Sequence, residues 1–462
     1  MRILRFALAA AGLTLAVIGP IIGPAGAQVI QSAPVIGENY APKPIAIPDF
    51  KGATPQAQSI AAQMSDVVRN DLAGSGIFRL IDKAAYVEKD LDINTTPRFA
   101  DWTVIQAQNL VVGNVAFDAH GNLVTQFRIY DTFLSKELFG QQYAAATPDD
   151  WRHVAHKVAD DIYSQLTGEQ GYFDSRIVFV AESGPNTDRK RRLAVMDQDG
   201  ANAEHLLGGV SNVVNARFSP SSQTIIYTAY VPDPKNPTVT RLRVYLYDIE
   251  TGRQEVLSEL ANGLQYAARF SPDGKSVVMS REEHGNSDIY VMDLARRIET
   301  RLTTSPAIDT SPSYSPDGKM IVFNSDRSGT PQLYIMRSDG GSMSCPNGGS
   351  DTACRISFGE GRYSTPVWSP RGDWIAFTKQ TGSNFGIGVL QPDGKGERML
   401  TESYLDEAPT WSPNGRVIAF TREAGPGAGD KLWSIDLTGR NLKRLPTPPG
   451  DASEPAWSPL LR

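Results

Sequence analysis

A short phrase, Ser-Pro followed mostly by a polar residue and Gly, occurs six times in the C-terminal two-thirds of this chain. Its serines lie 52, 44, 54, 43 and 46 residues apart, at Ser219, Ser271, Ser315, Ser369, Ser412 and Ser458. A period in the forties is typical of repeat architectures in which each unit is one small sheet that buries its faces only against its neighbours. The repeat therefore predicts a β-propeller over most of the chain.

The parts of each unit support this prediction. Ser at the first position, Pro at the second and Gly at the fourth are the preferences of a type I turn. An inner-strand segment precedes the turn, and near-continuous apolar runs such as residues 321–323 follow it. Runs of this kind are typical of strands that are covered on both faces.

The two ends of the repeat region are incomplete in complementary ways. Residues 176–181, 193–196 and 205–207 look like the later strands of a blade, whereas residues 455–459 supply an inner strand and a turn with almost nothing after them. Five full units and these two parts predict six blades. The C-terminal strand should pair with the first propeller segment and close the ring, which leaves only short protected edges.

The region before the propeller has a different pattern. Residues 59–73 carry apolar residues at a spacing of four and predict a helix, as does the stripe over 151–166 that follows Thr147 and Pro148. A strand at 45–50, three consecutive strands between 110 and 143, and a helix around 102–108 complete the expected set. We predict an α/β domain over 43–167 and a six-bladed β-propeller over 168–462.

The first 27 residues are typical of a cleaved secretory signal peptide. Arg2 and Arg5 precede an apolar stretch, and Ala25-Gly26-Ala27 offers a small-residue cleavage site that would leave Gln28 as the mature start. The net charge of −6 becomes more negative after cleavage. This balance disfavours binding to nucleic acid and to anionic membrane surfaces.

Residues 28–42 form a segment with too few apolar residues to fold alone. Two interpretations remain open: a free terminus, as most exposed ends are, or a strand that is added to the sheet edge of a partner. The apolar side chains available for the second role belong to Val29, Ile30, Val35 and Ile36.

Cys345 and Cys354 are the only cysteines of the chain, and they lie in one Gly/Ser-rich insertion. In an exported protein we expect them to form a disulfide. A metal site would need more ligands than two cysteines, and no histidine is close in sequence. We therefore expect no metal and no cofactor.

The sequence carries no recognisable catalytic motif. A Gly-x-Ser-x-Gly elbow is absent. His153 and His156 lack the spacing of a zinc protease motif and are interpreted as exposed helix residues, and Asp197, Asp199 and Asn202 as a turn between strands. A propeller enzyme would need paired carboxylates, for which Asp309, Asp406 and Glu454 are the candidates.

The residues just before each inner strand should surround one mouth of the central channel. As a group they are polar, acidic and aromatic: Asn212, Asn215, Gln265, Tyr266, Asp309, Thr310, Tyr363, Ser364, Asp406, Glu407, Ser453 and Glu454. They are either a solvated rim or a rigid surface for a partner loop.

Several segments resemble the TolB family of the Tol–Pal system, in the family's order. They are Lys43 to Pro48, the run from Asp71 to Phe78, Leu166-Thr167-Gly168, the Ser-Pro units, Leu405 to Pro409 and Pro455 to Pro459. The resemblance implies a non-enzymatic periplasmic adaptor that links the lipoprotein Pal to TolA and supports outer-membrane invagination at division and outer-membrane integrity. It also implies a monomer that approaches membranes only through its partners.

The resemblance also assigns residues. It places Pal at the propeller mouth, at Gln265, Thr310, Asp406 and Glu407, with Tyr266, Asp309 and Tyr363 beside them. It assigns TolA binding to the segment that contains Gln28, Val29, Ile30, Val35 and Ile36. An alternative function is that of a propeller enzyme or glycan-binding module that acts on cell-wall material.

Overall fold

The computed structural model describes residues 41–461, except 90, 186–187, 208–211, 234 and 261–262. The predicted signal peptide (1–27) and nearly all of the predicted partner-binding segment (28–42) lie outside the described residues. Within the described part of the chain, none of the helices combines the length and the apolar character that crossing a bilayer requires.

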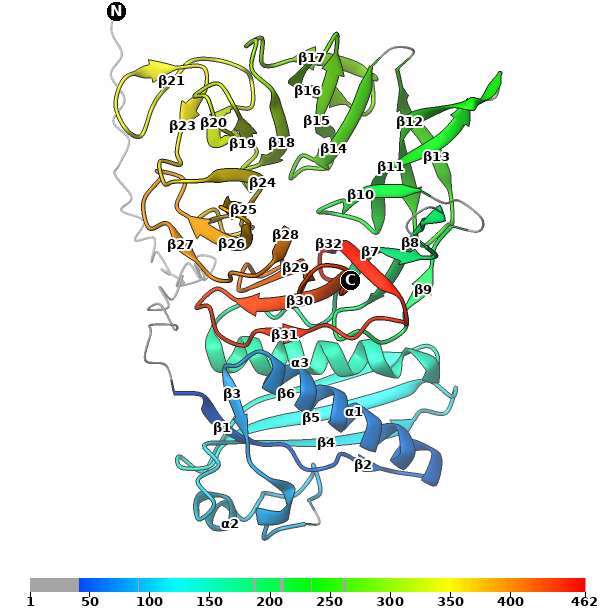
Figure 1. Cartoon of the computed structure of the whole chain (residues 1–462). Helices are drawn as coiled ribbons and strands as arrows, with labels where there is room; N and C mark the ends of the chain where they lie inside the picture. Colours follow the sequence, from blue (N-terminus) through cyan, green and yellow to red (C-terminus); the bar gives the residue numbers. More distant parts are fainter. Residues whose placement is uncertain are drawn as a thin grey trace, which may run out of the picture. The chain divides into compact units, whose positions relative to one another are not determined.

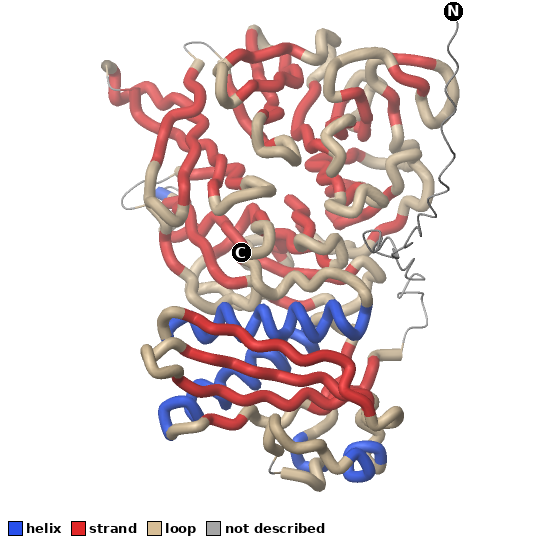
Figure 2. Tube along the Cα trace, turned by 180° about the vertical axis from the view of Figure 1, so that it is seen from behind, coloured by secondary structure: helices blue, strands red, loops and turns tan. Residues whose placement is uncertain are grey.

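The N-terminal region is a mixed sheet with two long helices packed on one face (Figures 1 and 2), while Trp102 of a short helix packs against the other face. The sheet has the order β3-β1-β4-β5-β6, and β2 pairs with β4. Its strands are β1 (Lys43–Ala46), β2 (Lys51–Gly52), β3 (Phe78–Leu80), β4 (Asn109–Phe117), β5 (Leu123–Asp131) and β6 (Lys136–Ala145). The three consecutive strands that the sequence predicted are the antiparallel run β4-β5-β6.

Two long helices supply the apolar layer against this sheet. Helix α1 (Pro55–Gly74) begins where the Thr54 side chain accepts a hydrogen bond from the Ala57 backbone N–H. Helix α3 (Trp151–Thr167) follows a short 3-10 turn, η2 (Pro148–Asp150), and ends at Gly168, whose φ of 75° suits glycine. The helix expected around 102–108 is shorter and earlier, as α2 (Phe99–Thr103), and η1 spans Lys83–Ala85.

Six four-stranded sheets surround a common centre in the rest of the chain (Figure 1), which confirms the predicted six-bladed propeller. Blade 1 contains β10 (Val213–Phe218), β11 (Thr224–Asp233), β12 (Asn236–Asp248) and β13 (Gln254–Glu259). Blade 2 contains β14 (Leu264–Phe270), β15 (Ser276–Glu283), β16 (Asn286–Asp293) and β17 (Ile298–Arg301). Blade 3 contains β18 (Asp309–Tyr314), β19 (Met320–Ser325), β20 (Gln332–Arg337) and β23 (Cys354–Arg355).

The remaining blades follow the same plan. Blade 4 contains β24 (Arg362–Trp368), β25 (Ile375–Thr381), β26 (Asn384–Leu390) and β27 (Arg398–Met399). Blade 5 contains β28 (Leu405–Trp411), β29 (Val417–Glu423), β30 (Lys431–Asp436) and β31 (Lys443–Arg444). Blade 6 joins β32 (Asp451–Trp457) from the end of the chain to β7 (Arg176–Ser183), β8 (Lys190–Asp197) and β9 (Glu204–His205).

Pairing of β32 with β7 confirms the predicted closure of the ring. The two strands run antiparallel, with Trp457 opposite Ile177 and Asp451 opposite Glu182. The Trp457 indole also donates a hydrogen bond to the Ser175 hydroxyl at 2.8 Å. Blade 6 is therefore built from both ends of the propeller region, so neither end leaves an open edge.

In blades 1 to 5 the Ser-Pro turn connects the first and second strands. In blade 2 the Gly274 N–H donates to the Ser271 carbonyl at 2.9 Å, and the φ of Gly274 is 68°. The Ser271 hydroxyl accepts from the Ser276 N–H at 2.9 Å. The serine therefore joins both ends of the turn, as the repeat pattern predicted.

The cysteine insertion belongs to blade 3. A small hairpin of β21 (Met343–Ser344) and β22 (Ser350–Asp351) precedes β23, and Cys345 forms the predicted disulfide with Cys354. Because Cys354 lies in the outer strand β23, the disulfide ties the inserted hairpin to the blade edge.

The α/β elements and the propeller share one hydrophobic core. Val68 and Ile162 from the helices belong to the same buried cluster as Phe179 and Trp457 from blade 6. The predicted boundary at 167/168 stays a prediction, because packing continues across it. Polar contacts cross it too, since Arg416 of blade 5 forms an ion pair with Glu169.

His156 corrects an expectation from the sequence. It is buried in α3, where its Nδ1 lies 2.6 Å from the Asp71 carboxylate of α1, and the Gln198 amide donates to the other oxygen of Asp71 at 2.7 Å. Burial alone would lower the pKa of His156, but the Asp71 carboxylate raises it to about 9. His153 is also engaged, with Asp174 at 2.5 Å. Neither side chain is a free surface histidine.

Candidate functional site

The six inner strands carry the predicted site residues at equivalent repeat positions. Counting back from the serine of each turn, the sixth residue is fully or almost fully buried in all six blades. These residues are Val213, Gln265, Asp309, Tyr363, Asp406 and Ala452, and each is at most 3% exposed. In each blade, the residues six, five and four positions before the serine lie near the start of the inner strand. We call these residues together the strand-start ring.

Four of the seven residues assigned to the predicted Pal mouth occupy this buried position. Asp309 accepts two hydrogen bonds from Arg327, at 2.8 and 3.0 Å, and Asp406 accepts two from Arg422, both at 2.6 Å. Both carboxylates are completely enclosed. They lie within the blades and do not project from an open rim, so a direct role in partner binding stays a prediction.

Tyr363 and the amide nitrogen of Gln265 are also hydrogen-bonded within their own blades, whereas the buried Gln265 Oε1 has no hydrogen-bond partner among the described residues. The Gln265 amide donates to Glu299 at 2.9 Å. The Tyr363 hydroxyl donates to Glu397 at 2.7 Å, while the Lys379 ammonium lies 4.8 Å from the centre of the tyrosine ring. Buried polar groups that are hydrogen-bonded in this way hold a scaffold in one conformation.

The other three predicted residues lie one position later and are only partly buried. Tyr266 shares a hydrogen bond of 2.9 Å with Ser287, and the Thr310 hydroxyl accepts from Asn324 at 2.8 Å. Among the described residues, the Glu407 side chain has no hydrogen-bonding or ion-pair partner. Tyr266, Thr310 and Glu407 are therefore the accessible members of the predicted site.

Negative charge gathers around Glu407. Burial raises its pKa to about 6, and the charges of Asp430, Glu454 and Glu423 add to this effect. The pKa of Asp430 is likewise raised to about 6, by burial and by neighbouring carboxylates. Asp309 and Asp406, two of the three carboxylates considered for an enzyme, are already paired with arginine. The acidic character of the ring is therefore concentrated at Glu407 and its neighbours Glu423, Asp430 and Glu454.

A repeated backbone feature accompanies these side chains. The residue four before each serine has a positive φ, between 46° and 56°, although none of the six is glycine: Asn215, Ala267, Ser311, Thr365, Ala408 and Glu454. The strand register shifts at the same place in every blade. Bulges of this kind are common at the rims of β structures and re-aim the side chains beside them.

His156, Asp197 and Asp199 lie close enough together to hold a metal ion. Arg152, however, forms ion pairs with both aspartates, at 3.4 Å from Asp197 and in closer contact with Asp199. The positive charge that such a cluster needs is therefore supplied by the chain itself. As the sequence predicted, Asp197 to Asn202 form the turn between β8 and β9.

Sequence reasoning missed two residues of the channel, Arg217 and Arg269. They occupy the position two before the serine in blades 1 and 2, where the other blades have Ser313, Val367, Thr410 and Ala456. Comparison of the repeats position by position would have found them, because no other blade has a charged residue there.

Comparisons with known proteins agree on one family. The amino-terminal domain model of TolB matches residues 34–138, and the TolB β-propeller domain model matches residues 163–461, more than half of the chain. The chain belongs to the TolB family. A Tol-Pal system protein TolB of Dinoroseobacter shibae is 50% identical over 422 residues, which cover 91% of each chain. That of Gluconobacter oxydans is 41% identical over 423 residues, which cover 90% of this chain and 86% of the relative.

A solved structure supports the same assignment. The crystal structure of TolB from Acinetobacter baumannii matches with a TM-score of 0.76 at 29% identity, and the match covers 91% of this chain and 97% of that one. The TolB resemblance that the sequence suggested is thereby confirmed, together with the fold of an α/β domain and a six-bladed propeller.

Proposed function

We propose that this protein is a non-enzymatic adaptor of the Tol–Pal system that works in the periplasm, where it binds Pal at the strand-start ring and TolA through its N-terminal segment. In this role it supports outer-membrane invagination at division and outer-membrane integrity. Membership in the TolB family carries the proposal. The rigid, internally bonded ring supports it, because loops and strand ends on a stiff scaffold are common binding surfaces.

The acidic part of the ring gives the proposal its chemistry. Glu407 is partly accessible and has acidic neighbours in Asp430 and Glu454, so a basic group of Pal would relieve their mutual repulsion on binding. Thr310 and Tyr266 would add hydrogen bonds from blades 2 and 3. Asp309 and Asp406 serve as internal braces for these positions.

We predict that Glu407→Lys lowers the affinity for Pal by at least tenfold, since it replaces an attractive charge with a repulsive one. Titration calorimetry with purified Pal measures the change, and circular dichroism checks the fold. Glu250→Lys is the matched control, because Glu250 is exposed and lies in the turn between β12 and β13, at the end of blade 1 where the Ser-Pro turn lies. Equal Pal affinity of the two variants would remove Glu407 from the site.

The N-terminal segment is tested by truncation. Removal of residues 28–36 from the mature chain should abolish capture of TolA and leave Pal affinity unchanged, because every described strand of the sheet and the propeller begins at Lys43 or later. Pull-down with each purified partner measures both effects. Retained TolA binding would contradict the assignment to Gln28–Ile36, and loss of both partners would point to a folding defect instead.

A further inference from the structure

A cavity of about 450 Å³ lies at the end of the channel where the inner strands finish. All six Ser-Pro turns contribute to its wall, each with its proline, together with the aromatic residue that precedes each serine. We call this wall the turn ring. Along each inner strand the turn ring begins two residues after the last position of the strand-start ring, so the two rings share no residue and face opposite ends of the channel.

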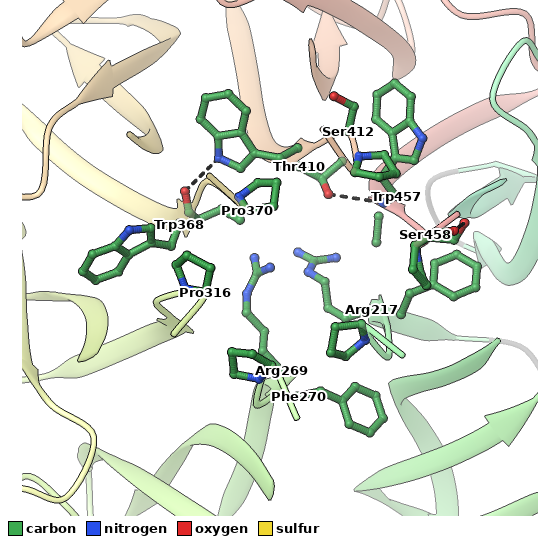
Figure 3. Close-up of a pocket in the computed structure, with 18 of the residues that line it drawn as sticks. Arg217, Arg269, Phe270, Pro316, Trp368, Pro370, Thr410, Ser412, Trp457 and Ser458 are labelled. Atoms are coloured by element: carbon green, nitrogen blue, oxygen red, sulfur yellow. Dashed lines mark hydrogen bonds between the residues drawn. The ribbon is translucent and has the colours of Figure 1, made fainter. Parts of the chain in front are cut away.

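Two guanidinium groups project into this cavity. Figure 3 shows Arg217 and Arg269 side by side, both reaching into the centre of the space between Pro316, Trp457 and Ser458. They come from the equivalent position of adjacent blades. The other four residues at this position are uncharged and also line the cavity: Ser313, Val367, Thr410 and Ala456.

The two positive charges lack a carboxylate partner in the wall. None of the described lining residues is Asp or Glu. Arg217 donates one hydrogen bond, to the Ala216 backbone carbonyl at 2.6 Å, and among the described residues Arg269 has no hydrogen-bonding partner. This contrasts with Arg327 and Arg422, each of which forms two hydrogen bonds with an aspartate of the strand-start ring.

Two neighbouring guanidinium groups of like charge repel each other unless an anion lies between them. Burial lowers the pKa of Arg269 and the charge of Arg217 lowers it further, while burial also lowers the pKa of Arg217, against an opposing effect of Glu454. Both side chains keep some solvent exposure, but the proline and aromatic rings around them lower the local polarity and so strengthen the repulsion. An anion between the two groups would convert this repulsion into two attractive contacts.

We propose that the turn ring is a binding site for a small dianion that carries carboxylate or phosphate groups, held between Arg217 and Arg269. Planar guanidinium groups match both kinds of oxyanion through paired N–H donors. The cavity has the size of a small-molecule site, and its apolar walls suit a short carbon chain between two anionic groups. The site faces the opposite end of the channel from the proposed Pal surface and is formed by different residues.

Thermal unfolding of the full mature chain tests the site, with succinate, inorganic phosphate and acetate added at constant ionic strength. Succinate or phosphate should raise the melting temperature by about 2 °C at ten times the dissociation constant, and the rise should continue with the logarithm of the ligand concentration above that. Acetate, with a single charge, should bind at least tenfold more weakly. Stabilisation by succinate alone indicates a carboxylate ligand, and stabilisation by phosphate alone indicates a phosphate ligand.

Variants separate this site from general anion effects. Arg217→Ser with Arg269→Ser should abolish the ligand-dependent shift, and the chain itself tolerates serine at this position in blade 3. Arg296→Ser is the matched control, because Arg296 is exposed and its side chain lies on a blade 2 turn. It should keep the full response. Without added anion, the Arg269→Ser variant should melt at a higher temperature than the wild type.

Three results would overturn the proposal. They are a wild-type melting temperature that does not respond to either dianion, an equal response in the double serine variant, and acetate binding as tight as that of succinate. Because Pal affinity is measured separately at Glu407, failure of the anion site leaves the proposed adaptor function standing, and the reverse also holds.

Discussion

The two ends of the six inner strands differ in how they treat charge. At the strand-start ring the buried aspartates Asp309 and Asp406 are each paired with an arginine of the same blade. At the turn ring, Arg217 and Arg269 face the same cavity, and the described residues of its wall include no aspartate or glutamate. The inner strands of the six blades have the same backbone plan and repeat positions. The difference in charge between the two ends therefore comes from the side chains that single blades place there.

This difference shows how a repeat fold separates framework from site. Asp309 and Asp406, which brace the propeller, are each paired with an arginine of the same blade and are fully enclosed. Charges that remain unsatisfied, such as Glu407 at one end and Arg269 at the other, are those left for a ligand. The comparison thus distinguishes residues whose loss should damage folding from residues whose loss should damage binding.

The largest effect should come from removing the strand that contributes to both rings. Deletion of residues 454–462 removes much of β32, including Trp457 and its hydrogen bond to Ser175. We expect loss of cooperative unfolding or a loss of stability comparable with the whole of a typical domain, about 5 kcal/mol or more. Thermal denaturation followed by circular dichroism measures it. A truncated protein as stable as the wild type would refute the closure of the ring by β32.

A smaller but still large effect is expected at the enclosed pair of the strand-start ring. Asp406→Ala leaves Arg422 without its partner, which should cost about 3–5 kcal/mol of unfolding free energy. Denaturant titration measures this loss. Asp393→Ala is the control, since its ion pair with Lys395 is exposed, and its unfolding midpoint should not move. A stable Asp406→Ala protein with weakened Pal binding would place Asp406 in the site after all.

The smallest effect concerns the accessible carboxylate of the same ring. Burial raises the pKa of Glu407 in the folded protein to about 6, above its value of 4.5 in the unfolded chain. The folded state therefore binds the proton more tightly, so stability is higher below pH 4.5 and falls as the pH rises through 6. Glu407→Gln should remove this fall and stabilise the protein at pH 7 by about 1 kcal/mol.

Denaturant titrations at pH 4.5 and pH 7.5 check this prediction. The difference between the two pH values should shrink in the Glu407→Gln variant, while Asp430, whose pKa is also raised to about 6, supplies the part that remains. An unchanged pH dependence would show that Glu407 is not the group responsible. It would also weaken the contrast between satisfied and unsatisfied charges.

Much of the fold could be predicted because its signals are local or periodic. The Ser-Pro-x-Gly turns have a fixed chemistry, and the complementary ends of the repeat region indicated the closure between β32 and β7. Helix α3 was visible from its stripe of apolar residues, and the disulfide from the only two cysteines. The site residues were harder to predict. A residue's place near the mouth of the channel does not say whether its side chain points outward or into the blade.

His156 and the arginine pair show why these features escaped. The partner of His156 is Asp71, 85 residues earlier in the chain, and nothing near either residue indicates the contact. Arg217 and Arg269 lie 52 residues apart and meet only because adjacent blades bring equivalent positions side by side. Contacts between residues so far apart in sequence depend on how the whole chain folds, and no short sequence pattern around either residue indicates them.

The sequence by itself determined the number of blades, the order of their strands and the family, since turn chemistry and apolar periodicity act over a few residues and recur. Tertiary structure alone decided which charges are neutralised and which are left open to a ligand. The reason is that the energy of a charge depends on the distance and burial of groups that are remote in sequence, and only the folded chain fixes these.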